Sequence, residues 1–238
     1  MDKLLLFLPT LNESKSASLL IDEINKKLSV DFLVIDDGST DGTDIELINL
    51  GLSNLKIIQR GSRLGIGSAH LEALLYAKKN LYDFILTMDA DGTHRVVDVI
   101  RIIQMKSNAD LVIGSRFAPG AQISDWPRMR IFLTFAAHLV TKYGLGLKHD
   151  SSSGLRCYKL SSFDIQLIDK FNGAGYDFFF KSLHRIALEN KSILDIPVTL
   201  EARVLGNSKM TFFQASKSIA ALIFKVLEFR LKVLIARF

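Results

Sequence analysis

Short apolar runs alternate with segments of helical spacing along the first half of the chain, and this alternation limits the possible folds more than any other feature. The apolar runs occupy residues 3–8, 31–37, 54–60, 82–89 and 109–115. Helical spacing occurs between them, over residues 12–28, 67–80 and 96–106. Runs that do not alternate with polar residues are typical of strands buried on both faces. The pattern therefore predicts an α/β fold with a mostly parallel central sheet and helices on both faces.

The second half of the chain has a less regular pattern. We expect helices over residues 129–143 and near 176–190, strands near 192–204, and a helical end from residue 209. The length of 238 residues fits one large domain with an appendage. The predicted division is a main domain over residues 1–208 and a C-terminal tail over residues 209–238.

Composition and charge exclude several classes of protein. The only cysteine is Cys157, so an intrachain disulfide is excluded and a reducing compartment is favoured. No window approaches the roughly 18 uninterrupted apolar residues of a membrane span. The net charge is +5, and residues 211–238 contribute +4 of it, which suggests an anionic partner for the tail. Nucleic acid is not expected, because few aromatic residues lie among the basic ones outside the tail.

Two aspartates follow the fourth apolar run. Asp89 and Asp91 are two positions apart, so they point to the same side at the end of the predicted strand. Carboxylates this close repel unless a cation lies between them or one stays protonated. Mg²⁺ or Mn²⁺ would remove the repulsion, and Thr93 is near enough to complete the oxygen shell. The alternative is a polar turn whose aspartates cap the next helix at Val96.

Polar groups also end the first two predicted strands. Asp36 and Asp37 follow the second strand, where a carboxylate can accept hydrogen bonds from a base or a ribose. The alternative there is an Asx turn followed by a helix cap at Asp41. Pro9 and Glu13, in "PTLNE", end the first strand in the same way.

A glycine-rich stretch, "RGSRLGIGSA" over residues 60–69, precedes the second predicted helix. Backbone N–H groups at a helix start favour phosphate. However, His70 takes the place of the third glycine of a dinucleotide fingerprint, and no Gly-Lys-Ser/Thr follows as in a P-loop. A plain helix start is the better interpretation of this stretch alone. Four polar strand ends in succession nevertheless indicate a nucleotide and its metal.

The order of these motifs resembles the family-2 glycosyltransferases of the GT-A (Rossmann-like) type. Within them the chain is most similar to the dolichol- or polyprenyl-phosphate mannose synthases, from Leu8 to about Met210. The resemblance rests on "PTLNE", "VIDDGSTDGT", "GIGSA", "MDADGTH", "VIGSRF", "WPRMR", "SSSGLRCYK", "GYDF" and "RVLGNSKM". It implies a GT-A catalytic domain over residues 1–208.

The resemblance also implies roles for individual residues. The nucleotide-sugar donor would contact Pro9, Glu13, Asp36, Asp37, Gly65, Asp89, Ala90, Arg203 and Lys209. The Mg²⁺ or Mn²⁺ ion that bridges the donor diphosphate would be held by Asp89, Asp91 and Thr93. The phosphate of a polyprenyl-phosphate acceptor would be bound by Arg116, Arg130 and Thr134. The catalytic set would be Asp89, Asp91, Arg116 and Arg130. Arginine forks suit phosphate oxygens, and solvated surface charge is the alternative for the two arginines.

The chain departs from the family pattern at four positions. Thr93 stands where glutamine is common, and Gly92 where a hydrophobic residue is common. Lys181 replaces a glutamate, and Leu11 replaces an aromatic residue beside the base. These departures concern the identity of the sugar and the nucleotide more than the class of reaction.

The implied reaction is attack by a lipid phosphate oxygen on the anomeric carbon of a nucleotide-diphosphate sugar, with mannose from GDP-mannose as the expected donor. A single displacement inverts the anomeric centre. A phosphate monoester is already anionic at neutral pH, since its second pKa is near 6. No strong general base is needed, so the five histidines are expected to be structural or solvated. Catalysis would consist of positioning and metal stabilisation of the departing diphosphate.

The tail has the pattern of a basic amphipathic helix. One stripe of this helix, with helical spacing, consists of the charged residues Lys217, Lys225, Glu228 and Lys232 together with the small residue Ala221. Such a helix suits binding at a membrane surface, which would place the protein peripherally on a cytoplasmic face. Residues 130–140 are a second candidate for contact with lipid. Packing of the tail on the core, on a second copy of the chain or on a membrane protein is the alternative.

Two other functions fit parts of the sequence. One is a UDP-sugar-dependent family-2 transferase that acts on a glycan or a protein. The other is a non-catalytic relative that binds a nucleotide-sugar or anchors a membrane complex.

Overall fold

The computed structural model describes residues 2–126, 128–171, 173–201 and 219–229. The first half contains β1 (Leu4–Thr10), α1 (Ser14–Lys27), β2 (Asp31–Asp36), α2 (Thr43–Ile48), β3 (Leu55–Gln59), α3 (Ile66–Lys79), β4 (Phe84–Thr87), α4 (Val96–Gln104) and β5 (Leu111–Ser115). The second half contains β6 (Gln122–Ile123), α5 (Arg128–Leu145), β7 (Arg156–Lys159), η1 (Leu160–Ser162), α6 (Ile165–Asp169), α7 (Asp177–Leu188), β8 (Ile193–Pro197) and β9 (Thr199–Leu200). Residues 219–229 are also helical.

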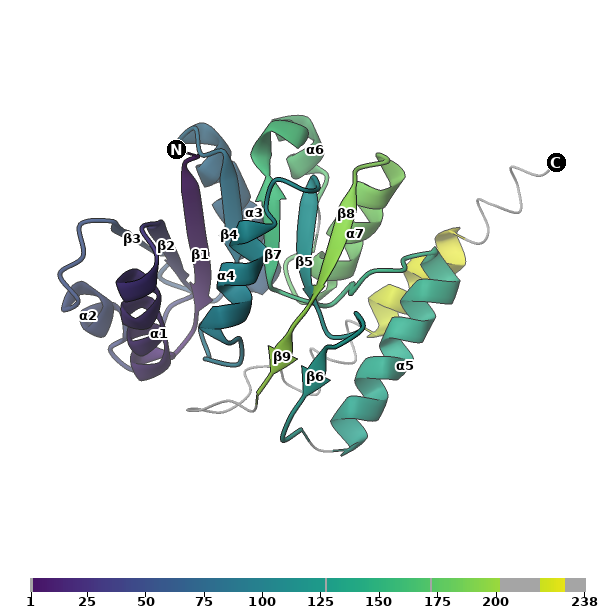
Figure 1. Ribbon diagram of the computed structural model, residues 1–238, viewed down its shortest axis with the longest axis horizontal. Coiled ribbons are helices and arrows are strands. Elements are labelled where there is room, and N and C mark those ends of the chain that lie inside the picture. The colour runs from purple at the N-terminus through teal and green to yellow at the C-terminus, as the bar shows by residue number, and fades with distance from the viewer. Residues whose placement is uncertain (1, 127, 172, 202–218, 230–238) are drawn as a thin grey trace.

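One seven-stranded sheet forms the centre of the molecule, in the order β3-β2-β1-β4-β7-β5-β8 (Figure 1). Its neighbours pair in parallel, except that β7 is antiparallel to both β4 and β5. Strands β6 and β9 form a separate parallel pair. The predicted mostly parallel sheet is confirmed, and the inserted antiparallel strand β7 is an addition that the apolar pattern did not reveal.

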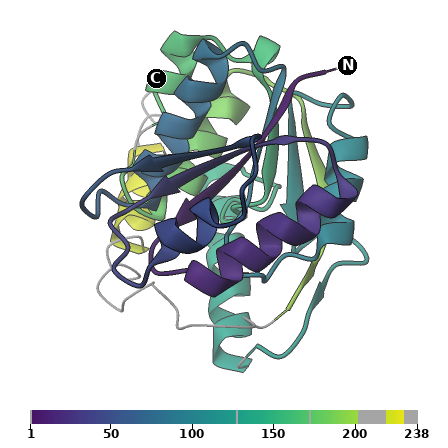
Figure 2. The ribbon, with the colours of Figure 1, turned by 90° about the vertical axis from the view of Figure 1, so that its left-hand side faces the viewer.

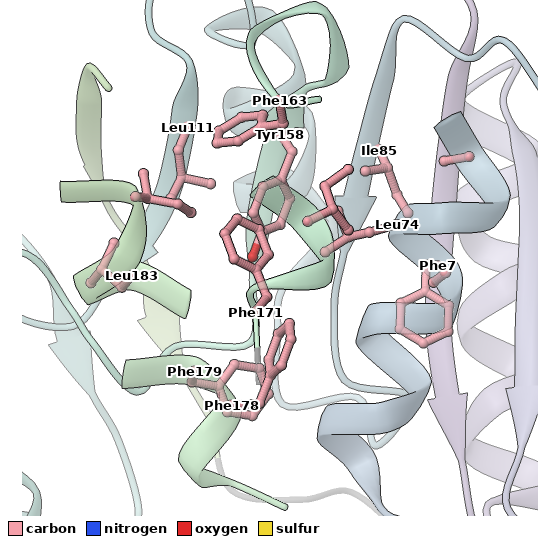
Figure 3. Packing of buried hydrophobic residues seen from close by; sticks show 14 of the residues in the cluster. Phe7, Leu74, Ile85, Leu111, Tyr158, Phe163, Phe171, Phe178, Phe179 and Leu183 are labelled. Carbon is pink, nitrogen blue, oxygen red and sulfur yellow. The ribbon is translucent and has the colours of Figure 1, made fainter. Parts of the chain in front are cut away.

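Helices cover both faces of this sheet, as Figure 2 shows from the β3 edge. On one face, α1, α2 and α4 pack on the alternate side chains of β1, β2 and β4. On the other face, α3, α6 and α7 enclose a core rich in aromatic residues (Figure 3). Strands buried on both faces explain why the sequence has continuous apolar runs there.

The sheet direction brings four strand ends to one edge. Strands β1, β2 and β4 are mutually parallel, and β5 runs the same way because two antiparallel steps through β7 restore the direction. The carboxyl ends of these strands therefore lie at the same edge, where ligands bind in open α/β sheets. This edge carries the polar residues that follow each strand.

The helix at residues 219–229 packs on the rest of the protein. Leu222 is buried in the aromatic core, and the Phe229 ring meets His184 of α7 edge-on at 5.3 Å. Gly144 of α5 leaves room for Val226, since a Cβ at Gly144 would lie 2.7 Å from it. The predicted helical tail is confirmed over residues 219–229 only, because the rest of it and the boundary at residues 208/209 lie outside the described residues.

The polar stripe predicted for the tail is only partly exposed at its described positions in this helix. Lys225 and Glu228 form a half-buried ion pair at 3.0 Å, and Lys217 and Lys232 lie outside the described residues. The large exposed side chains are instead apolar, at Ile219, Ile223, Phe224 and Leu227. Across the described ranges, no helix combines the length and apolar character needed to cross a membrane.

Candidate active site

The two aspartates after β4 differ in their surroundings. Asp91 is buried, and its Oδ1 accepts hydrogen bonds from the backbone N–H and the hydroxyl of Thr93, at 3.1 and 2.7 Å. The Asp89 side chain is 36% exposed, and its Oδ2 lies 3.7 Å from Nε2 of His94. The N-cap of α4 is Arg95, and no side chain caps that helix end. The aspartates therefore do not cap α4, although Asp91 and Thr93 form the polar turn of that alternative. The Asp89 side chain is partly exposed at the sheet edge.

The oxygen atoms at this position fit a hard divalent cation. Carboxylate oxygens from Asp89 and Asp91 are the ligands that Mg²⁺ and Mn²⁺ prefer. Among the described residues there is no cluster of three or more histidine, cysteine or acidic side chains that could hold a metal by itself. A cation here would need further oxygens from a bound substrate, as is usual for magnesium bound with phosphates. The two hydrogen bonds from Thr93 fix the orientation of the Asp91 carboxylate.

The residues after β2 are held by the protein itself. Asp36 accepts from the hydroxyl of Thr10 at 2.8 Å and from the backbone N–H groups of Gly38 and Ser39 at 3.1 and 2.7 Å. This is an Asx turn, the alternative left open by the sequence. Asp37 accepts from Nη1 of Arg60 at 2.6 Å and from the N–H of Gly65 at 2.8 Å.

The glycine-rich stretch also serves packing. Gly67 and Ser68 donate their N–H groups to the carbonyl of Ala174, at 2.9 and 3.4 Å. A Cβ at Gly65 would lie 2.3 Å from that carbonyl oxygen, and one at Gly67 would lie 2.1 Å from the carbonyl oxygen of Gly173. Glycine is required because two backbone segments approach closely. The plain helix start is confirmed, and the predicted donor residue Gly65 lies beside Asp37.

The remaining predicted donor residues lie around the same edge. Glu13 is the N-cap of α1, and its buried carboxylate accepts from the hydroxyl of Ser16 at 2.8 Å. Pro9 is half-buried near the end of β1, and the methyl group of Ala90 is buried in the core. Arg203 and Lys209 lie outside the described residues. Glu201 donates its N–H to the carbonyl of Thr93 at 3.2 Å, so residue 201 lies beside the Asp89–Asp91 loop.

Arg116, after β5, is not a solvated charge. Its Nε and Nη2 donate to the two carboxylate oxygens of Asp150 at 2.8 and 2.6 Å, and its backbone N–H donates to the same carboxylate at 3.0 Å. The Arg116 side chain is 10% exposed, and Asp150 is fully buried. Nη2 also donates to the hydroxyl of Ser152. The alternative of solvated surface charge is therefore wrong for Arg116.

Electrostatics keep this pair charged. Burial by itself lowers the pKa of Arg116, but attraction and hydrogen bonds from Asp150, together with attraction from Asp89, raise it above its ordinary value. Burial by itself raises the pKa of Asp150, and Arg116 brings that pKa below its ordinary value. The opposite charges of Asp89 and Arg116 therefore attract one another across the sheet edge.

Arg130 and Thr134 lie one turn apart on α5. The Arg130 guanidinium lies over the Trp126 ring, with Cζ 3.6 Å from its centroid, which is a cation–π contact. Thr134 is half-buried. Phe117, the residue after Arg116, stacks on His138 of α5 with ring centroids 3.8 Å apart. This stacking connects the loop of Arg116 to the helix that carries the other two predicted acceptor residues.

Sequence reasoning missed several charged residues near the site. Asp150, Arg60 and Arg156 are buried in contact with predicted site residues or with the loops that carry them. Arg156 lies within "SSSGLRCYK", a quoted motif to which no role was given, and Asp150 directly precedes that motif. The departure Lys181 forms an ion pair at 2.5 Å with Asp177, one turn earlier on α7. The sequence signal that could have identified these residues is the presence of charged residues within or beside polar motifs.

A mostly parallel sheet with an Asp-x-Asp pair and further carboxylates at its carboxyl edge defines the GT-A class of sugar transferases. The chain belongs to glycosyl transferase family 2, whose family model matches residues 6–165. It is therefore a glycosyltransferase, as the sequence predicted.

Two curated relatives are similar over most of the chain. Polyprenol monophosphomannose synthase of Mycolicibacterium smegmatis is 31% identical over 237 residues, which cover 96% of this chain and 87% of the relative. Undecaprenyl-phosphate mannosyltransferase of Micrococcus luteus is 32% identical over 213 residues, which cover 88% of each chain. The chain is thus related to polyprenyl-phosphate mannose synthases within the family.

Solved structures show the same fold. Glucosyl-3-phosphoglycerate synthase from Mycobacterium tuberculosis, in complex with Mn²⁺, UDP-glucose and phosphoglyceric acid, aligns with a TM-score of 0.67 at 21% identity. The alignment covers 94% of this chain and 80% of that one. The complex of the same enzyme with Mg²⁺ and UDP also gives 0.67, at 22% identity, over 94% of this chain and 79% of that one. The predicted GT-A fold is confirmed.

Proposed function

We propose that this glycosyltransferase moves mannose from GDP-mannose to a polyprenyl phosphate at a membrane surface, with Mg²⁺ or Mn²⁺ bound and with inversion at the anomeric carbon. The observation that carries the proposal is the placement of opposite charges at one sheet edge. The partly exposed carboxylate of Asp89 would face the donor, and its charge attracts that of Arg116, which would face the acceptor. Both relatives are named for mannosyl transfer to a polyprenol or an undecaprenyl phosphate.

Each group of residues would have one part in the reaction. Asp89 and Asp91 would hold the cation, which when bound neutralises the charge that develops on the diphosphate leaving group. Arg116 and Arg130 would bind the acceptor phosphate and direct its oxygen toward the sugar. Asp150 keeps the Arg116 fork in a fixed orientation.

Three of the five histidines are poor candidates for a general base. Burial lowers the pKa of His70 to about 3, so this imidazole is neutral at physiological pH and has no tendency to take up a proton. Burial also lowers the pKa of His138 and of His184. A phosphate nucleophile with a second pKa near 6 needs no such base. Positioning by charged residues is therefore sufficient for the proposed chemistry.

A donor panel tests the proposal. The full chain is incubated with a short polyprenyl phosphate, Mn²⁺ or Mg²⁺, and radiolabelled GDP-mannose, GDP-glucose or UDP-glucose. We expect label in the organic phase with GDP-mannose and none after chelation of the metal. Transfer of label only from UDP-glucose, or only to a water-soluble glycan, would contradict the proposal. It would favour a UDP-sugar-dependent family-2 transferase that acts on a glycan. Neither binding nor transfer with any donor would favour a non-catalytic relative.

The surface proposed to meet the membrane is formed by two helices, and we refer to it as the apolar face. Its large exposed side chains are Met129, Phe132, Leu133, Leu139, Val140 and Tyr143 of α5 together with Ile219, Ile223, Phe224 and Leu227. Exposed cationic side chains on α5 accompany it, at Arg128, Arg130 and Lys142. Apolar residues with nearby cations suit the interface of an anionic bilayer.

We expect the double substitution Phe132→Asp and Leu133→Asp to lower the affinity for anionic phospholipid vesicles by about 10² to 10⁴-fold, because burial of each side chain in the bilayer contributes about 1.5–3 kcal/mol. Co-sedimentation measures the affinity. The matched control is Ile45→Asp, at a similarly exposed position of α2. This helix lies at the opposite end of the molecule from α5 (Figure 1). Equal binding by all three proteins would show that the apolar face does not contact the bilayer.

A further inference from the structure

Arg156, the first residue of β7, is a fully buried cation without an acidic partner among the described residues. Its Nε donates to the carbonyl of Ser153 at 2.9 Å, and its Nη2 donates to the carbonyls of Ser151 and Phe179 at 3.2 and 2.8 Å. Nη1 donates to the hydroxyl of Ser182 at 3.1 Å. Burial of a guanidinium is costly even when it is hydrogen-bonded. A role beyond packing would account for keeping it.

The acceptors of Arg156 show what it holds. Two of them are carbonyls of one short segment, residues 150–154, which we call the polar turn. The polar turn is also fastened to the strands beside it. The hydroxyl of Ser153 donates to the carbonyl of Gly114 in β5, and the hydroxyl of Thr87 in β4 donates to the carbonyl of Gly154, each at 2.7 Å.

The polar turn touches both halves of the proposed active site. Asp150, at its start, holds the Arg116 fork on the acceptor side. Gly154, at its end, lies against Asp89 on the metal side, since a Cβ at Gly154 would be 3.2 Å from Oδ1 of Asp89. One buried guanidinium therefore supports a segment that contacts the carboxylate for the cation and the arginine for the phosphate.

We propose that Arg156 is a positioning residue for sugar transfer, which fixes the polar turn so that Asp89 and Arg116 keep a set separation and orientation. This inference rests on the proposed function, in which Asp89 faces the metal and donor and Arg116 faces the acceptor. Arg156 itself contacts no substrate. It acts through Gly154 on one side and through Asp150 on the other.

Substitution of Arg156 by glutamine and by lysine tests this role. We expect Arg156→Gln to lower kcat on the order of 10²-fold, the loss that follows a displacement of about 1 Å. Arg156→Lys should regain part of this loss, because it keeps a charged donor. The control is Arg185→Gln on α7, where the arginine pairs with Glu189 at 2.6 Å and kcat should not change. A folded Arg156→Gln protein with the wild-type kcat would overturn the proposal, as would a loss that merely matches its unfolded fraction.

A second variant covers the case in which Arg156→Gln does not fold. Gly154→Ala leaves the buried charge in place and moves the Asp89 carboxylate by contact. We expect weaker binding of Mn²⁺, measured by calorimetry with GDP present and without acceptor, and no additional loss when Gly154→Ala is combined with Asp89→Asn. Wild-type Mn²⁺ affinity in Gly154→Ala, or an additive loss in the double variant, would refute the role. Because the readout is metal binding, it differs from failure of wild-type sugar transfer, which would refute the proposed function.

Discussion

Replacing Asp89 with alanine is expected to lower sugar transfer by on the order of 10³-fold while leaving the fold intact. The Asp89 side chain is partly exposed at the sheet edge, and its removal leaves no cavity in either core. The bound cation would lose one of its two carboxylate ligands from the chain. Loss of about 4 kcal/mol of stabilisation of the leaving diphosphate corresponds to this factor.

The radiolabel assay with GDP-mannose and polyprenyl phosphate measures this effect, and the melting temperature checks the fold. Asp89→Asn should lose nearly as much, because an amide is a poorer ligand for a hard cation. The control is Asp22→Asn, an exposed carboxylate of α1 that pairs with Lys26 and should not affect transfer. Substantial transfer by Asp89→Ala, with unchanged dependence on metal concentration, would contradict the assignment.

The central sheet could be predicted because the burial of each strand determines the pattern of apolar residues within that strand. A strand such as β1, buried on both faces, must be apolar at nearly every position, and helices packed on it must be apolar at every third or fourth. β7 escaped this reasoning because it begins with Arg156 and ends with Lys159. Its first residue, Arg156, is buried and hydrogen-bonded, so a charged residue occupies a position where the apolar pattern predicts a hydrophobic one.

The predicted metal pair and its missed supports show the same limit. Asp89 and Asp91 are two residues apart in the loop after β4, so their placement near the end of that strand could be predicted from the sequence. Because β4 ends at Thr87, the alternation of a strand does not place their side chains on one side. The partner of Arg116 is Asp150, 34 residues later, and only the tertiary fold brings them together. The start of α1 is similar. The N–H of Ser14 donates to the carboxylate of Asp41, 27 residues later in the chain.

Replacing Asp150 with alanine is expected to destabilise the protein by about 3–5 kcal/mol, because it leaves the Arg116 guanidinium buried without its counter-charge. Chemical denaturation measures the free energy of unfolding. Asp22→Ala, which breaks the exposed pair with Lys26, should cost no more than about 1 kcal/mol. A similarly small cost for Asp150→Ala would mean that Arg116 is solvated.

The pH dependence of stability follows from the direction of the Asp150 shift. Its pKa in the folded protein lies below the ordinary value of 3.8. The stabilisation is therefore complete above that value and is lost as the pH falls through the lower pKa of the folded state. Asp150→Asn should lack this component of acid unfolding. Denaturation curves of the two proteins between about pH 5 and pH 2 would reveal the difference.

A double variant separates the stabilising role of the pair from its role in transfer. Arg116→Met combined with Asp150→Leu removes both charges and keeps apolar volume, so it should recover most of the stability lost in Asp150→Ala. It should not recover sugar transfer, because the Arg116 guanidinium that would bind the acceptor phosphate is gone. A stable double variant with wild-type kcat and wild-type KM for polyprenyl phosphate would show that the pair is structural and that the acceptor is bound elsewhere.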